Sequence, residues 1–169
     1  MQFRFIKFIF TFYLLFLFSY SFGQKEHNIW YFGDKAGIDF NTSPPTPLLD
    51  GNNYSTEISA VQSDDNGNLL FYVGVDSLTY FYSTVWDKHH NKMPNGDSID
   101  CNYSVTQGLL ILPMDNYGRC FYLFSIGQES IPSSPRAIMT LEYSIIDMTA
   151  NGGLGTVTQK NKILYGDIV

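Results

Sequence analysis

A strand-turn-strand cassette that occurs twice limits the folds open to this chain more than any other feature. The first copy runs from Glu57 to Gly96 and contains DDNGNLLFY at 64–72, followed by VWD at 85–87. The second copy follows about 50 residues later, with DNYGRCFY at 115–122 and YSIID at 143–147. A period of this length is typical of repeat architectures, in which each unit packs against its neighbour.

The first 23 residues have the pattern of a secretory signal peptide. Arg4 and Lys7 precede an uncharged apolar stretch at 8–18, and small residues flank Phe22 as in a cleavage site. This stretch has about ten residues, whereas a membrane-spanning helix needs about 20. We therefore expect residues 1–23 to be a cleaved signal and 24–169 to form the mature chain, secreted or at the outer cell surface and without a membrane segment.

The mature chain is acidic. Arg4 and Lys7 are the only charged residues of the signal, so eight basic residues remain against 16 acidic ones. Binding to a phosphate backbone requires clustered Lys and Arg, and the remaining basic residues form no run. We expect no nucleic-acid partner.

Short β-rich segments separated by Gly, Asn, Asp and Pro recur through the mature chain, and helical periodicity is absent. This pattern predicts three hairpins, with turns at 33–35, 65–67 and 115–118 and a loop at 41–53. The hairpins pair 28–32 with 37–40, 58–62 with 68–73, and 107–112 with 119–126, and further strands are expected within 75–87 and at 160–169.

Two of the predicted strands are continuous apolar runs rather than alternating ones. The runs are LLFYV at 69–73 and LLIL at 109–112, and each predicts a strand covered on both faces. The stacked blades of a β-propeller supply such an environment. We expect an all-β fold, a partial β-propeller-like repeat of antiparallel sheets with about two to three blades. Because propellers use about four to eight blades, we expect the repeat to be incomplete as given, with 160–169 as a strand awaiting its partners.

Several of these motifs resemble a known family. They are NIWYFG at 28–33, GNLLFY at 67–72, VWD at 85–87 with NKMPNG at 91–96, YSIIDM at 143–148 and NGGLG at 151–155. Together they look like the propeller-like amino-terminal region of large Bacteroidota surface proteins, which often continue into PKD-type domains and a gliding-motility-associated carboxy-terminal domain read by type IX secretion. The resemblance implies a longer product with further carboxy-terminal domains. It implies no catalytic residues.

The residues we expect to matter are structural. Gly67 and Gly118 serve the turns, and Trp30 and Trp86 pack between sheets. The full set is Trp30, Gly67, Phe71, Trp86, Asp87, Gly96, Gly118 and Phe121. Trp30 with Tyr31, or Trp86 with Asp87, could alternatively line a carbohydrate platform.

Cys101 and Cys120 are the only cysteines, and two readings stay open for them. Export to an oxidising compartment permits a disulfide between them. Alternatively, Cys120 is a small buried side chain on a strand.

We expect no metal and no cofactor. The Asp64-x-Asn66-x-Asn68 spacing is similar to a calcium loop, but it lacks the sixth-position glycine and the distal Glu. His89 and His90 have no further ligands at zinc-site spacing, so a solvated turn is the simpler reading.

The sequence contains no Gly-x-Ser-x-Gly elbow and no spacing that implies a triad. Carboxylates such as Asp34 with Asp39, or Glu57 with Asp87, are read as turn acids rather than as an acid and base for glycoside hydrolysis. We therefore expect a non-enzymatic scaffold or binding module, adhesion- or gliding-associated, for an unknown protein or glycan ligand. The alternative is the amino-terminal blades of a propeller hydrolase that acts on glycans.

Overall fold

The computed structural model describes residues 25–168, except residues 56, 78, 103 and 131–136. The expected signal peptide lies outside the described residues. Within them the chain is all-β apart from one short 3-10 helix, and its strands form three antiparallel sheets. No helix among the described residues is both long enough and apolar enough to cross a membrane.

The sheets follow one another along the chain. The first sheet has the order β1-β2-β3, with strands Ile29–Phe32, Ala36–Asp39 and Thr46–Leu48. The middle sheet has the order β4-β5-β6-β7, with strands Ser59–Ser63, Leu69–Asp76, Thr79–Asp87 and Ile99–Asp100. The last sheet has the order β8-β9-β10-β11, with strands Leu109–Pro113, Cys120–Ser130, Ala137–Asp147 and Thr156–Ile168, and η2 (Asn151–Gly153) joins β10 to β11.

The three predicted hairpins are confirmed. β1 pairs with β2, β4 with β5, and β8 with β9. Gly67 and Gly118 lie in the turns at φ values of 88° and 62°, a region that a residue without a Cβ enters at no steric cost. Local turn chemistry and the apolar pattern therefore account for these pairings.

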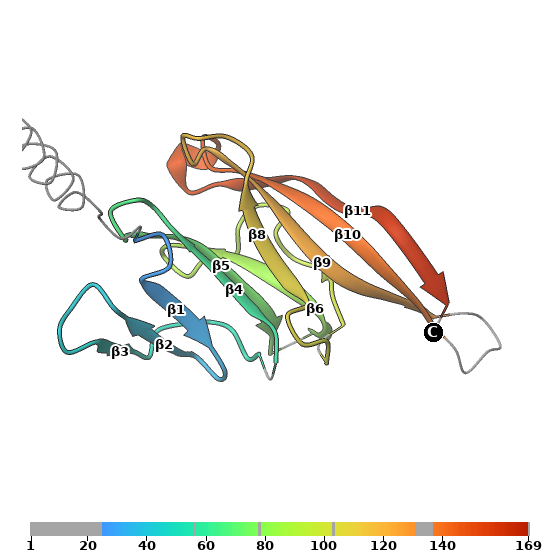
Figure 1. The fold of residues 1–169 in the computed structure, drawn as a ribbon, viewed down its shortest axis with the longest axis horizontal. Helices are drawn as coiled ribbons and strands as arrows, with labels where there is room; N and C mark the ends of the chain where they lie inside the picture. Colours follow the sequence, from blue (N-terminus) through green and yellow to red (C-terminus); the bar gives the residue numbers. More distant parts are fainter. Residues whose placement is uncertain (1–24, 56, 78, 103, 131–136, 169) are drawn as a thin grey trace, which may run out of the picture.

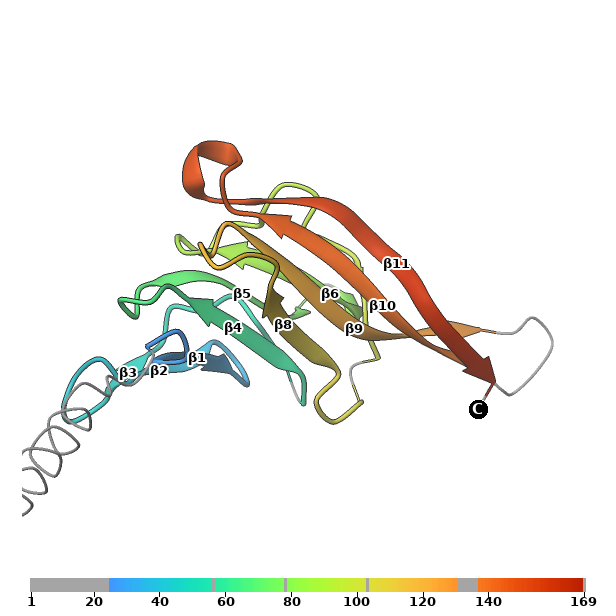
Figure 2. The same ribbon diagram turned by 45° about the horizontal axis from the view of Figure 1, so that its top comes forward.

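The middle sheet is covered on both faces, as the continuous run at 69–73 predicts. Phe71, Val73 and Val75 lie in the larger core cluster, which the last sheet completes with residues such as Phe121 and Leu123. The opposite face carries Tyr72 and Trp86, which pack with Tyr31 of the first sheet. Figures 1 and 2 show the first sheet in blue to teal and the last sheet in dark yellow to red on either side of the middle sheet.

The same prediction is wrong for the run at 109–112. Leu109 is buried, but Leu110 is 53% exposed and Leu112 is 43% exposed. Only one face of β8 is covered by the middle sheet, because Ile111 packs on the core cluster while its neighbours point the other way. An apolar run alone does not report whether a second sheet is present.

Two further expectations need correction. The segment 41–53 is not only a loop, because it contains β3, which pairs with β2. The strand expected at 160–169 begins at Thr156 and already has a partner, since β11 pairs with β10 along most of its length. The sequence did not predict β3, because the segment 41–53 is rich in Pro and Asn. It predicted β11 too short, because the strand begins with polar residues and has no apolar pattern there.

Candidate functional site

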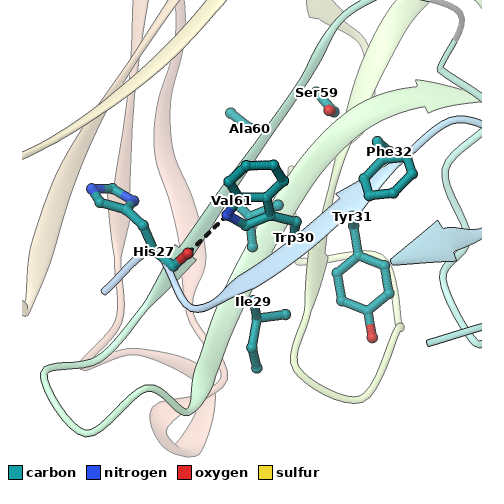
Figure 3. A pocket seen from close by; sticks show the side chains of 8 residues that line it. All are labelled: His27, Ile29, Trp30, Tyr31, Phe32, Ser59, Ala60 and Val61. Atoms are coloured by element: carbon teal, nitrogen blue, oxygen red, sulfur yellow. Dashed lines mark hydrogen bonds between the residues drawn. The ribbon is translucent and has the colours of Figure 1, made fainter. Parts of the chain in front are cut away.

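A groove of about 340 Å³ lies between the edges of the first and middle sheets. β1 and β4 run beside each other there, and the Ser63 N–H donates to the Glu26 carbonyl oxygen (3.0 Å) at one end. The lining residues are His27, Ile29, Trp30, Tyr31, Phe32, Ser59, Ala60 and Val61 (Figure 3).

Trp30 is the largest exposed side chain in the groove. We expected it to pack between sheets, but it is 51% exposed. Alternation along β1 sends Tyr31 into the core and therefore places Trp30 and Phe32 on the other side of the strand (Figure 3). The Trp30 indole N–H donates to the His27 carbonyl oxygen at 2.8 Å. The Trp30 and Phe40 rings meet edge-on, with their centroids 5.2 Å apart. These two contacts hold the indole in place.

A buried aromatic stack lies on the opposite side of β1 from Trp30. Tyr31 stacks on Tyr72 with ring centroids 4.6 Å apart, and Tyr72 stacks on Trp86 at 5.2 Å. Burial raises the pKa of both tyrosines. Trp86 is 2% exposed, so it packs between the sheets as expected. It cannot also form a carbohydrate platform.

A polar network ties the stack to the loop after β3. The Tyr31 hydroxyl donates to Asp50 Oδ1 at 2.8 Å, and Asp50 Oδ2 lies 3.4 Å from His90 Nε2. His90 Nδ1 lies 3.1 Å from the Tyr72 hydroxyl, which accepts the Asn52 N–H at 3.0 Å. His90 therefore packs against the two tyrosines and is not a freely solvated turn residue, whereas His89 is exposed.

Asp64 and Asp87, considered as a ligand and as a catalyst, are bound into turns. Asp64 Oδ1 accepts the N–H groups of Asn66 (2.9 Å) and Asn68 (2.8 Å), and Asp64 Oδ2 accepts Asn68 Nδ2–H. Burial opposes ionisation of Asp64, but these hydrogen bonds outweigh it and lower its pKa. Asp87 and Asp115 accept the N–H groups two and four residues ahead in the same way.

These aspartate hydrogen bonds explain why the same turn sequence occurs in both copies of the cassette. An aspartate at the end of a strand supplies the acceptor that a tight turn needs. Among the described residues, no group of three or more His, Cys, Asp or Glu side chains is arranged to hold a metal ion. The hydrogen bonds of Asp64 show that the residues of the Asp64-x-Asn66-x-Asn68 spacing build a turn.

The two cysteines are free. Cys101 is buried and accepts a hydrogen bond from Ser83 Oγ at 3.1 Å, whereas Cys120 begins β9 opposite Asp147. The disulfide reading is therefore not supported, and the small-side-chain reading fits Cys101 better than Cys120, which is only partly buried. Burial raises the pKa of both thiols.

The remaining structural residues occupy packed positions. Phe71 and Phe121 are in the core between the middle and last sheets. Gly96 accepts the Val85 N–H at 2.7 Å and lies so close to Met93 and Val85 that a Cβ would meet Met93 O at 2.9 Å. Sequence reasoning missed His27, Phe32 and Ser59 as groove residues. The only sequence pattern that could have indicated this groove is the placement of Trp30 and Phe32 on the opposite side of the strand from Tyr31.

Comparison with known proteins adds no relative: no family model, no curated protein and no solved structure matches the chain. The site has to be interpreted from its own geometry.

Proposed function

We propose that this protein is an exported, non-enzymatic binding module that holds a glycan in the groove beside Trp30. The observation that carries the proposal is the half-exposed indole, fixed by its bond to His27, over a groove of about 340 Å³. The C–H faces of a sugar ring pack on aromatic faces, while its hydroxyls need a few placed polar groups. His27 and Ser59 supply such groups at the groove.

The scaffold in this proposal is a propeller-like stack of sheets. Its support is that β4, the first strand of the middle sheet, lies beside both β1 and β8, the first strands of the other two sheets. First strands gather in this way around the axis of a propeller. The groove would then lie near that axis.

The backbone phase of β4 and β8 supports the same stacking. The Asp64 N–H donates to Asn68 O. The register shift between Gln62 and Ser63 places its extra residue in β5, so the alternation along β4 is unbroken. Ala60, four residues before Asp64, therefore also directs its backbone toward β5, the second strand of its sheet. In the last sheet, the Met114 N–H donates to Cys120 O in the same way. Leu110, four residues before Met114, is therefore the counterpart of Ala60. Ala60 packs toward the last sheet, the next sheet along the chain, and Leu110 points away from the middle sheet, the preceding one. Equivalent residues thus point in the same direction along the stack. The two sheets are therefore stacked in the same orientation and not as mirror images.

The rival proposal, a propeller hydrolase, has less support. Glycoside hydrolysis uses two carboxyl groups about 5 to 9.5 Å apart. None of the eight lining residues carries a carboxyl group, and Asp39 and Asp87 are engaged by neighbouring N–H groups. The described residues that line the groove therefore offer a surface to bind on and no carboxyl pair.

Export and surface exposure belong to the proposal too. They rest on the signal-like residues 1–23 and on the resemblance to Bacteroidota surface proteins. Mass spectrometry of the protein recovered outside the cells should give an amino terminus near Gln24. Recovery of the protein only inside the cells, with Met1 retained, would contradict export.

The glycan proposal is tested by intrinsic fluorescence. Residues 24–169 contain two tryptophans, and Trp30 is exposed while Trp86 is buried, so a ligand over the groove changes the emission of Trp30. Titration with a panel of purified oligosaccharides should give a saturable change for at least one of them. Trp30→Ala should raise its Kd at least about tenfold in calorimetry, a loss of about 1.4 kcal/mol.

Tyr117→Ala is the matched control, because Tyr117 is 79% exposed and lies outside the groove. Its Kd should equal that of the unaltered protein. No saturable binding across the panel would overturn the glycan ligand. Binding that Trp30→Ala leaves unchanged would overturn the groove as its site.

A further inference from the structure

The chain has three places where Asn is followed by Gly. They are 66–67 between β4 and β5, 95–96 between β6 and β7, and 151–152 between β10 and β11. Because glycine has no Cβ, its backbone nitrogen can come closer to the side-chain amide carbon of the preceding Asn than that of any other residue. The same dipeptide therefore carries the same latent chemistry at each place, and its surroundings decide whether the reaction proceeds.

The latent reaction is the loss of ammonia from the Asn side chain. The glycine nitrogen gives up its proton and forms a bond to Asn Cγ, the bond from Cγ to Nδ2 breaks, and Nδ2 leaves with that proton as ammonia. Water then opens the resulting cyclic imide at either of its carbonyl carbons, which leaves Asp or isoaspartate in place of Asn. Water is the co-reactant, and nothing is oxidised or reduced. The reaction needs a side-chain amide that can turn toward the glycine and a glycine N–H that is free of hydrogen bonds.

At 66–67 both reacting groups are held. Asn66 Nδ2–H donates to Asp65 Oδ1 at 3.0 Å, and the Gly67 N–H donates to the Asp64 carbonyl oxygen at 2.9 Å. Gly67 is also buried. This turn has to open before the ring can close, because both hydrogen bonds must break.

The pair at 95–96 is protected in the same two ways. Asn95 Nδ2–H donates to the Val157 carbonyl oxygen at 2.9 Å, which ties the side chain to β11. The Gly96 N–H donates to the Met93 carbonyl oxygen at 2.8 Å, and Gly96 is buried as well. Ring closure here also requires local opening of the fold.

The pair at 151–152 has neither restraint. None of the described residues accepts a hydrogen bond from the Asn151 amide or from the Gly152 N–H. Other groups close this turn, since the N–H groups of Gly153 and Gly155 donate to the Ala150 carbonyl oxygen at 3.0 Å and 3.2 Å. Asn151 and Gly152 are exposed, and nothing lies within 4 Å of the position that a Cβ on Gly152 would take. The amide carbon and the glycine nitrogen can therefore approach each other without first breaking a hydrogen bond of either group.

We propose that Asn151 is a modification site, which converts to Asp and isoaspartate without an enzyme and in preference to Asn66 and Asn95, because the fold protects only those two. The conversion adds a negative charge to the connection between β10 and β11. Isoaspartate also lengthens the backbone by one carbon, in the turn where the Leu154 N–H donates to the Asn151 carbonyl oxygen at 3.2 Å. The paired residues of β10 and β11 lie outside this turn, so the two strands stay joined.

Peptide mapping by mass spectrometry tests the proposal on residues 24–169 kept folded at mildly alkaline pH. Replacement of the amide by a carboxyl group raises the mass of the peptide, and electron-transfer fragmentation distinguishes isoaspartate from Asp. We expect Asn151 to react first, and Asn66 and Asn95 to react at least about tenfold more slowly, since each has two hydrogen bonds to break. A folded protein in which Asn151 reacts no faster than Asn66 or Asn95 would overturn the proposal.

The same chain in concentrated urea is the matched control, because it keeps the three dipeptides and loses their surroundings. The three rates should then become similar. A preference for Asn151 that persists unchanged in urea would contradict protection by the fold. Asn151→Gln is a second control, because the longer side chain would have to close a larger ring, so the mass increase of this peptide should disappear. A mass increase that survives the substitution would place the modification at another residue.

Discussion

Phe71 and Phe121 meet edge to face between the middle and last sheets, with ring centroids 5.3 Å apart and ring planes at 71°. Phe71 lies in the 64–72 segment of the first cassette and Phe121 in the 115–122 segment of the second, and both are almost completely buried. The two copies of the repeat are therefore joined through the same residue type.

Phe71→Ala should destabilise the protein by about 3 to 5 kcal/mol, because it removes a fully buried ring and leaves a cavity between two sheets. Denaturant unfolding measures the change. The double variant with Phe121→Ala should be less destabilised than the sum of the singles by about 0.5 to 1.5 kcal/mol, the usual coupling of an aromatic pair. Strict additivity would mean that the rings do not interact.

Trp86→Ala and Trp30→Ala remove the same atoms from opposite environments. Trp86 is 2% exposed and stacked on Tyr72, so its loss should cost about 3 to 5 kcal/mol. Trp30 is 51% exposed, so its loss should cost no more than about 1 kcal/mol. Thermal unfolding of the two variants side by side provides the comparison, and equal costs would contradict the placement of both residues.

Glu142 should make stability fall as the pH rises. Its side chain is 1% exposed and Oε2 has no hydrogen-bond partner. Burial raises its pKa, the hydrogen bond from Thr140 opposes this, and the charges of Asp100 and Glu129 add to it. Because the folded pKa is the higher one, the contribution of Glu142 is fully present below its ordinary value of 4.5 and is lost as the pH rises through the folded pKa.

Glu142→Gln removes this titration. At pH 8 the variant should be more stable than the parent by about 1 kcal/mol, since no charge is buried. At pH 4 the two proteins should be nearly equal. Unfolding measured from pH 4 to pH 8 gives both values, and parallel pH profiles would show that Glu142 does not titrate differently in the folded state.

Gly67→Ala and Gly152→Ala separate backbone strain from crowding. Both glycines have positive φ, 88° and 65°, so each substitution should cost about 1 kcal/mol through the backbone. A Cβ at Gly67 would also collide with the amide of Asn41, which donates to Gly67 O at 2.9 Å, whereas nothing lies within 4 Å at Gly152. Gly67→Ala should therefore cost about 1 kcal/mol more in chemical denaturation. Equal costs would show that Asn41 moves aside freely.

The local part of this fold could be read from the sequence. The hairpin turns at Gly67 and Gly118 and the all-β content follow from turn chemistry and apolar pattern, which act between near neighbours. Strand β3 could not be read, because its Thr46-Pro47-Leu48 resembles a loop and becomes a strand only by pairing with β2.

What lies on the two sides of each sheet was decided by tertiary packing alone. The sequence by itself determined that Trp30 and Tyr31 point to opposite sides of a strand, but not which of the two enters the core. The middle sheet decided it, because Tyr72 and Trp86 offer Tyr31 an aromatic stack while Trp30 is left over the groove. The runs at 69–73 and 109–112 are equally apolar, yet only the first is covered twice. Burial depends on a second surface that arrives from elsewhere in the chain, and no residue encodes it alone.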